Sequence, residues 1–222
     1  MSTVVAIDGP AGAGKSTVAK KLAARIGAAY INTGSLYRAL ALAAKEAGID
    51  LHEPLSPEFL NSQRLEFRGD ELFLNGIAPG ERLRMPECAA GASLVSKQPL
   101  VREYLLPVQR NAARGQWIVM EGRDIGTVIF PDARVKFFVT ASLEERAKRR
   151  LAQSGEVAAG ADLASVLEDI RRRDEQDTKR ATAPLKPAAD ALIVDTTGMS
   201  IEEVLEHLAG YCRKAGVSAA KS

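Results

Sequence analysis

Short apolar runs alternate along the chain with longer segments in which apolar residues recur every three or four positions. Residues 4–7, Val-Val-Ala-Ile, are a β-branched run typical of a fully buried strand. Residues 16–26 carry apolar side chains at helical spacing and are followed by a glycine, which predicts a helix. The two patterns repeat over residues 28–32 and 36–47. This β-α-β-α opening predicts a parallel sheet covered by helices.

Both patterns continue after residue 100, and with the first two strands they predict a five-stranded parallel sheet flanked by helices. Two of the later helices open on Ser-x-x-Glu, at Ser142 and Ser200, which is the arrangement of a capping box. The expected strands are residues 117–120, 135–139 and 192–194. The expected helices are residues 100–113, one that begins at residue 142, a long one that ends near residue 180, and a last one that begins at residue 200.

The middle of the chain has a different pattern, because residues 50–88 are polar and interrupted by prolines. Within this stretch, residues 65–68 and 71–74 alternate around a Gly-Asp pair, which predicts a small antiparallel hairpin. We therefore expect a small domain, residues 51–99, inserted into a core made of residues 1–50 and 100–222. The Gly-rich residues 154–161 predict a short lid at about residues 150–165.

Composition places the chain among ordinary globular proteins, with 46% hydrophobic and 26% charged residues in a length of 222. A net charge of only +2 gives no broad basic surface for nucleic acid. No apolar run reaches the length of a membrane span, and Asp8 interrupts the first one, unlike in a signal peptide. Cys88 and Cys212 are far apart, as expected of buried thiols in a reducing compartment. We expect a cytoplasmic protein without nucleic-acid or membrane partners, and a monomer, since no heptad seam is present.

The glycine-rich segment after the first strand matches the phosphate-binding pattern G-x-x-x-x-G-K-[ST] at every fixed position. Its glycines let backbone amides turn towards phosphate oxygens, and the helix that follows adds its positive end. Lys15 can reach the terminal phosphates, and the Ser16 hydroxyl can hold Mg²⁺. A chance Gly-rich turn is the alternative, but a strand precedes this segment and a helix follows it. The residues predicted to bind ATP are Gly9, Pro10, Ala11, Gly12, Ala13, Gly14, Lys15, Ser16 and Thr17.

A second set of polar residues follows the second and third expected strands. Thr33 and Arg38 come after one strand, and Glu121, Arg123 and Asp124 come after the other. The carboxyl ends of parallel strands share one edge of the sheet, where ligands of open α/β sheets bind. We therefore expect these side chains to lie together and to face the phosphate-binding segment.

Further arginines occur late in the chain, where helical spacing predicts that Arg173, Asp177 and Arg180 share one face. Phosphoryl transfer depends on positioning and electrostatic stabilisation, so converging guanidinium groups favour a kinase. An exposed helix with i,i+4 ion pairs is the alternative for this stretch. For the basic segment 146–150, a phosphate clamp on a lid and a plain exposed face stay equally open.

Several motifs, in one order along the chain, resemble those of the bacterial cytidylate kinase family within the nucleoside-monophosphate kinases. The resemblance runs from residue 4 to about residue 211, with Thr33 where members often carry Ser and Glu121 where many carry Asp. The motifs that carry it are residues 7–10, 33–34, 37–38, 121–128, 130–133 and 180–185.

The resemblance implies a P-loop kinase with a parallel sheet, an inserted monophosphate-binding domain and a short lid. It also implies transfer of the γ-phosphate of ATP to CMP or dCMP, with Mg²⁺. The implied catalytic residues are Lys15, Arg123 and Arg180. By the same resemblance, Ser93, Arg102 and Asp124 read the cytosine, Arg38, Arg123 and Arg180 hold the acceptor phosphate, and Arg173 and Asp177 face the sugar.

Two other functions are open to a protein with this phosphate-binding segment. One is a different small-molecule kinase, of the shikimate or uridylate type, against which the inserted hairpin and Asp124 argue. An aspartate can accept a hydrogen bond from the exocyclic amine of cytosine, where uracil offers only a carbonyl. The other is a nucleotide-dependent switch, but the Asn-Lys-x-Asp guanine-reading motif is not in the sequence.

Overall fold

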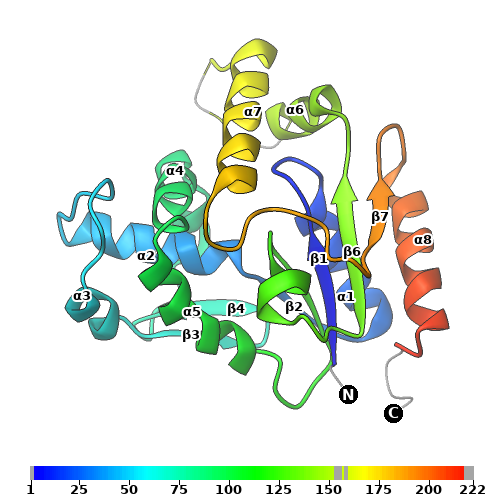
Figure 1. Cartoon of the computed structure of the whole chain (residues 1–222), viewed down its shortest axis with the longest axis horizontal. Coiled ribbons are helices and arrows are strands. Elements are labelled where there is room, and N and C mark those ends of the chain that lie inside the picture. Colours follow the sequence, from blue (N-terminus) through cyan, green and yellow to red (C-terminus); the bar gives the residue numbers. More distant parts are fainter. Residues whose placement is uncertain (1–2, 153–156, 158–159, 218–222) are drawn as a thin grey trace.

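The centre of the protein is a five-stranded sheet in which every neighbouring pair of strands is parallel, as predicted (Figure 1). The computed structural model describes residues 3–152, 157 and 160–217. The strand order is β2-β5-β1-β6-β7, so β1 lies in the middle and β2 and β7 form the edges. The strands are β1 (Val4–Asp8), β2 (Ala29–Asn32), β5 (Ile118–Glu121), β6 (Val135–Thr140) and β7 (Leu192–Asp195).

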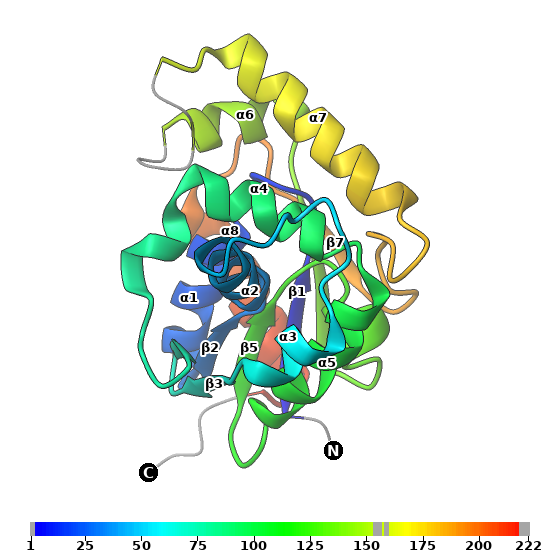
Figure 2. The same ribbon diagram turned by 90° about the vertical axis from the view of Figure 1, so that its left-hand side faces the viewer.

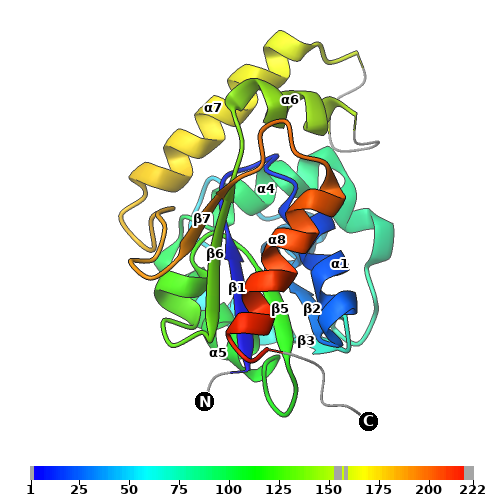
Figure 3. The same ribbon diagram turned by 90° about the vertical axis from the view of Figure 1, so that its right-hand side faces the viewer.

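Helices cover both faces of this sheet. On one face, α1 (Lys15–Ile26) and α8 (Ile201–Lys214) pack Leu22 and Leu208 against β1 and β6 (Figure 3). The other face is covered by α5 (Pro99–Asn111) and by a short π-helical turn, η2 (Ile125–Ile129), which sequence did not predict. Apolar side chains alternate between the two faces along β1, which explains why its whole run is buried.

The inserted region forms its own apolar cluster with α2 (Gly34–Glu46) and α5, beside the sheet (Figure 2). Its hairpin is confirmed, with β3 and β4 antiparallel, but the polar, proline-rich pattern gave no sign of the helices around it. The boundaries of the inserted domain stay a prediction. The elements are α3 (Pro57–Ser62), β3 (Leu65–Arg68), β4 (Glu71–Leu74), a 3₁₀ turn η1 (Gly80–Arg84) and α4 (Pro86–Val95).

The hairpin turn contacts the edge of the main sheet. The backbone N–H of Tyr30 in β2 donates to Oδ1 of Asp70 at 3.1 Å. This N–H points away from β5, so the hairpin supplies the partner that another strand would otherwise provide.

Two helices, α6 (Leu143–Leu151) and α7 (Leu163–Lys179), pack on each other above the carboxyl edge of the sheet (Figure 1). The capping box predicted at Ser200 is confirmed in both directions. At Ser142 only half of it forms, because the Ser142 N–H donates to the Thr197 hydroxyl instead of to Glu145. Most of the predicted Gly-rich loop, residues 153–156 and 158–159, lies outside the described residues.

Candidate active site

The segment after β1 forms a tight loop that only glycine permits at two positions. Gly9 and Gly12 have positive φ angles of 149° and 74°. A Cβ on Gly9 would lie 2.0 Å from the carbonyl oxygen of Val139, and one on Gly12 would lie 2.8 Å from that of Arg146. Because α1 starts at Lys15, directly after the loop, its free N–H groups and positive end are available to phosphate.

Lys15 is buried at the start of α1, with only 5% of its surface exposed. Its Nζ donates to the carbonyl oxygen of Pro10 at 2.6 Å, within the loop itself. Burial lowers the pKa of the Lys15 amine well below its usual value; the charge of Arg123 adds to this effect, and Glu121 opposes it. A phosphate oxygen would add negative charge beside the amine and favour its protonated form.

The buried carboxylate of Asp8, the last residue of β1, connects the loop to the opposite side of the pocket. Its two oxygens accept from the backbone N–H groups of Ile125 and Gly126, each at 2.8 Å. Burial raises the pKa of Asp8 to about 6, with the two backbone hydrogen bonds opposing the shift. Asp8 thereby fixes the first turn of η2, directly after Asp124.

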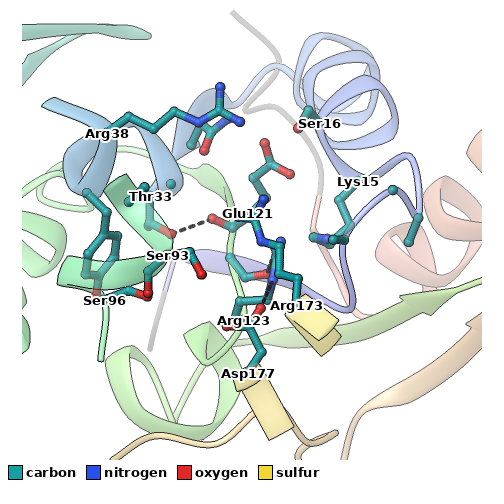
Figure 4. A pocket seen from close by; sticks show the side chains of 18 of the residues that line it. Lys15, Ser16, Thr33, Arg38, Ser93, Ser96, Glu121, Arg123, Arg173 and Asp177 are labelled. Atoms are coloured by element: carbon teal, nitrogen blue, oxygen red, sulfur yellow. Dashed lines mark hydrogen bonds and ion pairs between the residues drawn. The ribbon is translucent and has the colours of Figure 1, made fainter. Parts of the chain in front are cut away.

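At the ends of β2 and β5, three polar side chains meet beside the loop. Glu121 is only 3% exposed, and its Oε1 accepts a hydrogen bond from the Tyr30 hydroxyl at 2.5 Å. The Thr33 hydroxyl donates to the backbone carbonyl oxygen of Glu121 at 2.8 Å (Figure 4). The neighbouring strand ends predicted to share one edge of the sheet therefore do so, since Asn32 pairs with Glu121 in register.

Arginines from separate elements converge opposite the loop (Figure 4). Arg123 Nε donates to Oδ2 of Asp177 at 3.1 Å. Burial alone would raise the pKa of Asp177, but Arg123, Arg173 and Arg180 together lower it. Among the described residues, Arg173 makes no hydrogen bond, and burial beside Arg123 lowers the pKa of its guanidinium to about 10. The site concentrates positive charge that the protein itself does not neutralise.

Arg180 follows α7 rather than belonging to it, which corrects the prediction that it shares a helix face with Asp177. The helix ends at Lys179, and the extended backbone at Arg180 still brings its Nη1 within 3.6 Å of Asp177. The Nη2 of Arg180 is buried and has no hydrogen-bond partner among the described residues, with the Asp124 carboxylate 3.7 Å away. A buried donor without a partner is costly, which indicates that a ligand completes it.

The Asp124 carboxylate lines the pocket and is only 6% exposed. It forms an ion pair with Arg102, which in turn lies over the ring of Tyr37, with its Cζ 5.6 Å from the ring centroid. The Ser93 hydroxyl, from α4, donates to Gln176 Oε1 of α7 at 3.3 Å. The contact joins the inserted region to the α6–α7 pair across the pocket.

The basic segment 146–150 fits neither of its two interpretations as a whole. Arg146 is buried and donates to the Ala11 carbonyl oxygen at 3.0 Å and to the Asp174 carboxylate at 2.5 Å. Asp174 also accepts from the Ala11 N–H at 3.3 Å. Arg146 thus supports the loop from behind, while Arg150 lines the pocket.

One pocket brings together all nine side chains predicted for the acceptor. The residues from Ala11 to Thr17 also line it, whereas Gly9 and Pro10 shape the turn behind it. Other lining residues were given no role from the sequence, although Tyr37 lies in a family motif and Arg150 in the basic segment 146–150. The predicted acceptor residues in the pocket are Thr33, Arg38, Ser93, Arg102, Arg123, Asp124, Arg173, Asp177 and Arg180, and the lining residues without a predicted role include Asn32, Tyr37, Ser96 and Arg150.

The residues present fit a magnesium ion bound mainly through phosphate. The Ser16 hydroxyl lines the pocket and is exposed, and the Glu121 carboxylate lies in the same wall. Both are oxygen donors, which Mg²⁺ prefers, and it usually takes few protein ligands beside phosphate and water. Among the described residues, no group of three or more His, Cys, Asp or Glu forms a metal cage. No described helix is long and apolar enough to cross a membrane.

Comparison with known proteins gives a consistent result. The sequence model of the cytidylate kinase family matches residues 5–214. The chain is 46% identical to a cytidylate kinase of Thermosipho melanesiensis, covering 92% of this chain and 94% of that protein. It is 45% identical to the one of Caldanaerobacter subterraneus, with 96% of each chain covered.

Solved structures share the fold at low sequence identity. An uncharacterized protein from Eubacterium ventriosum aligns with a TM-score of 0.54 at 13% identity, covering 95% of this chain and 98% of that one. A sugar kinase from Janibacter aligns with a TM-score of 0.50 at 14% identity, covering 99% and 100%.

A central strand leading into a phosphate-binding loop, with an arginine-rich acceptor site at the same sheet edge, defines a P-loop kinase. Within that class, the chain belongs to the cytidylate kinase family. It is an enzyme, a nucleoside-monophosphate kinase that phosphorylates CMP or dCMP with ATP.

Proposed function

We propose that this chain transfers the γ-phosphate of ATP directly, in line, to a phosphate oxygen of CMP or dCMP, in the presence of Mg²⁺. The products are ADP and CDP or dCDP. The loop residues 9–17 bind the donor. The acceptor phosphate is mostly ionised at neutral pH, so its oxygen attacks without a general base.

The observation that carries this proposal is that two buried cationic side chains in one pocket have hydrogen-bonding capacity left for a ligand. On the donor side, Lys15 is buried with only a backbone carbonyl as hydrogen-bond partner. On the acceptor side, Arg180 keeps one buried nitrogen without a hydrogen bond. Two phosphate groups brought between them would complete both sites, and the convergence would stabilise charge on the transferred group.

The acceptor roles follow from the resemblance to the family, and all of their residues line this pocket. Arg38, Arg123 and Arg180 hold the acceptor phosphate, while Arg173 and Asp177 face the sugar. Asp124, carried by the turn after β5, accepts from the exocyclic amine of cytosine, and Arg102 and Ser93 complete the base site. Lys15, Arg123 and Arg180 act as the catalytic residues by stabilising the charge that develops during transfer.

Mg²⁺ would be held by the Ser16 hydroxyl, with Glu121 on its water shell, and would supply charge neutralisation between the phosphates. We further propose that residues 51–99 act as the monophosphate-binding domain and residues of about 150–165 as a lid. A cytoplasmic location fits the two buried, free cysteines. We also propose a monomer, which sedimentation at working concentration tests.

The experiment that tests the proposed function is a panel of acceptors, CMP, dCMP, UMP, AMP and shikimate, each with ATP and Mg²⁺. We expect turnover with CMP and dCMP to exceed that with the others. Efficient turnover of shikimate or AMP with none of CMP would contradict the base site, and GTP-selective binding without any turnover would favour a switch.

A further inference from the structure

Tyr30 contacts one of the two groups assigned to magnesium, the Glu121 carboxylate, although it is not among the residues that line the pocket. Its hydroxyl donates to Glu121 Oε1 at 2.5 Å. Tyr30 lies in β2, whereas Glu121 ends the neighbouring strand β5. The hydroxyl group therefore connects one strand to the functional end of the next.

The ring of Tyr30 is fixed by packing. It packs against the apolar cluster formed by α1, α8 and the strands β1, β5 and β6, whose members include Val18, Leu22 and Val119. Burial beside the negative Glu121 raises the pKa of the Tyr30 hydroxyl, so the group remains a neutral donor. A rigid ring with a single polar end sets the hydroxyl in one place.

The Glu121 side chain has three rotatable bonds and is buried in the pocket wall. It therefore requires a protein group to hold its carboxylate in one orientation. A lysine or arginine in contact with it would cancel the negative charge that a cation needs. A neutral hydroxyl instead occupies one oxygen of the carboxylate and leaves its charge in place. The other oxygen then has a defined direction.

We propose that Tyr30 is a positioning residue for Mg²⁺, which orients the Glu121 carboxylate beside the Ser16 hydroxyl so that its second oxygen faces the water shell of the ion. The inference rests on the proposed use of Mg²⁺ with ATP and deepens it. Tyr30 touches neither the nucleotide nor the ion and acts only through Glu121.

Tyr30→Phe tests this inference, because it removes the hydroxyl and retains the ring. Mn²⁺ binding to the protein with a non-hydrolysable ATP analogue, measured from the signal of free Mn²⁺ by electron paramagnetic resonance, should weaken about 10-fold, the lower end for loss of a supporting group. Analogue binding without metal and the KM for CMP should not change, and excess Mg²⁺ should restore kcat. Unchanged Mn²⁺ affinity in the folded variant would overturn the inference.

Two further variants separate positioning from general destabilisation. Glu121→Gln should weaken Mn²⁺ binding at least as much, and adding Tyr30→Phe to it should cause no additional loss. Additive losses would mean that Tyr30 acts independently of Glu121, against the inference. Tyr211→Phe is the matched control. Tyr211 is 41% exposed, and it lies in α8, far along the chain from the phosphate-binding loop. These affinities are measured without CMP, so they hold whichever acceptor the enzyme uses.

Discussion

Lys15 donates its hydrogen bond to the carbonyl oxygen of Pro10, 2.6 Å away in the same loop. The amine therefore spans the loop that binds phosphate instead of reaching into solvent. Binding of ATP replaces or shares this contact, so the lysine enters the reaction from a position that is already ordered. The cost of ordering a long side chain is met on folding rather than during turnover.

Lys15→Met should lower kcat by a factor on the order of 10²–10³, as expected when one preorganised donor to developing charge is removed. At pH 7 the free energy of unfolding should not decrease. The pKa of the amine is lower in the folded than in the unfolded state, so burying its charge opposes folding below the unfolded pKa. Coupled-assay kinetics and urea unfolding measure the two effects. The control is Lys21→Met on the exposed face of α1; a near-normal rate for Lys15→Met would refute the role.

Gly12→Ala and Gly48→Ala form a matched pair. Both glycines have φ near +70°, so each substitution should cost about 1 kcal/mol of backbone strain. Only at Gly12 would the new Cβ approach a backbone atom, at 2.8 Å, whereas nothing lies within 4 Å at Gly48. We expect Gly12→Ala to lose more stability than Gly48→Ala, because the clash adds to the shared backbone strain, and only Gly12→Ala to lose ATP affinity, measured by calorimetry. Equal ATP affinity in the two variants would contradict the tight-loop geometry.

Asp124→Asn should reduce kcat/KM for CMP roughly 10- to 100-fold, because a hydrogen bond to a charged group is worth about 1.5–3 kcal/mol. UMP should lose less, since its base offers no amine to Asp124, and the CMP-to-UMP ratio should fall. Affinity for ATP should stay unchanged. Asp132→Asn, on an exposed surface, serves as control. If the CMP-to-UMP ratio is the same in Asp124→Asn and wild type, Asp124 does not read the base.

Arg180→Met should raise the KM for CMP roughly 10- to 100-fold, because it removes a hydrogen bond between charged groups, which is worth about 1.5–3 kcal/mol. The KM for ATP should change little, because Arg180 lies on the acceptor side. Its partnerless Nη2 is the basis of this expectation. Arg172→Met removes an exposed arginine of α7, eight residues before Arg180, and should leave both KM values unchanged. Initial-rate kinetics decide, and a selective rise in the KM for ATP would reverse the assignment of the two sides.

Asp8 gives a pH prediction with a definite sign. Its pKa is about 6 in the folded protein against an ordinary value of 3.8, so between these pH values the folded state binds the extra proton. Stability contributed by this group is therefore present at pH 4 and lost as pH rises through about 6. The pKa difference corresponds to about 3 kcal/mol.

Comparison with Asp8→Asn isolates this contribution, since other groups titrate in both proteins. From pH 4 to pH 7, the wild type should lose about 2.4 kcal/mol of unfolding free energy relative to the variant, because Asp8 of the unfolded chain is already partly ionised at pH 4. Urea denaturation at each pH measures this loss. A difference between the two proteins that does not vary with pH would show that folding does not raise the pKa of Asp8.

The parts of the site that sequence could predict are those determined by a local pattern. The glycines around Lys15, the strand before them and the helix after them all lie within a few residues, so the loop was correctly predicted. Strand ends were predictable for the same reason, and in parallel strands they share an edge. The arginines follow from a chemical requirement for positive charge rather than from geometry.

The elements that were missed show where local patterns fail. From the sequence, Pro57 and Pro86 were interpreted as interruptions of regular structure. Both nevertheless occupy the first turn of a helix, Pro57 in α3 and Pro86 in α4. Proline is suited to that position, because the N–H it lacks has no partner there. Arg146 and Asp174 support the loop by hydrogen bonds to Ala11, which precedes each of them by more than 130 positions. Nothing in the spacing of these residues predicts the contact.

The contact between Asp70 and the Tyr30 backbone has a consequence for the protein in concentrated solution. β2 is an edge strand, and an outward N–H on such a strand can pair with a strand of another molecule and start aggregation. Asp70 occupies this donor and places a negative charge beside it. The hairpin of the inserted region thus also protects this edge of the sheet from intermolecular pairing.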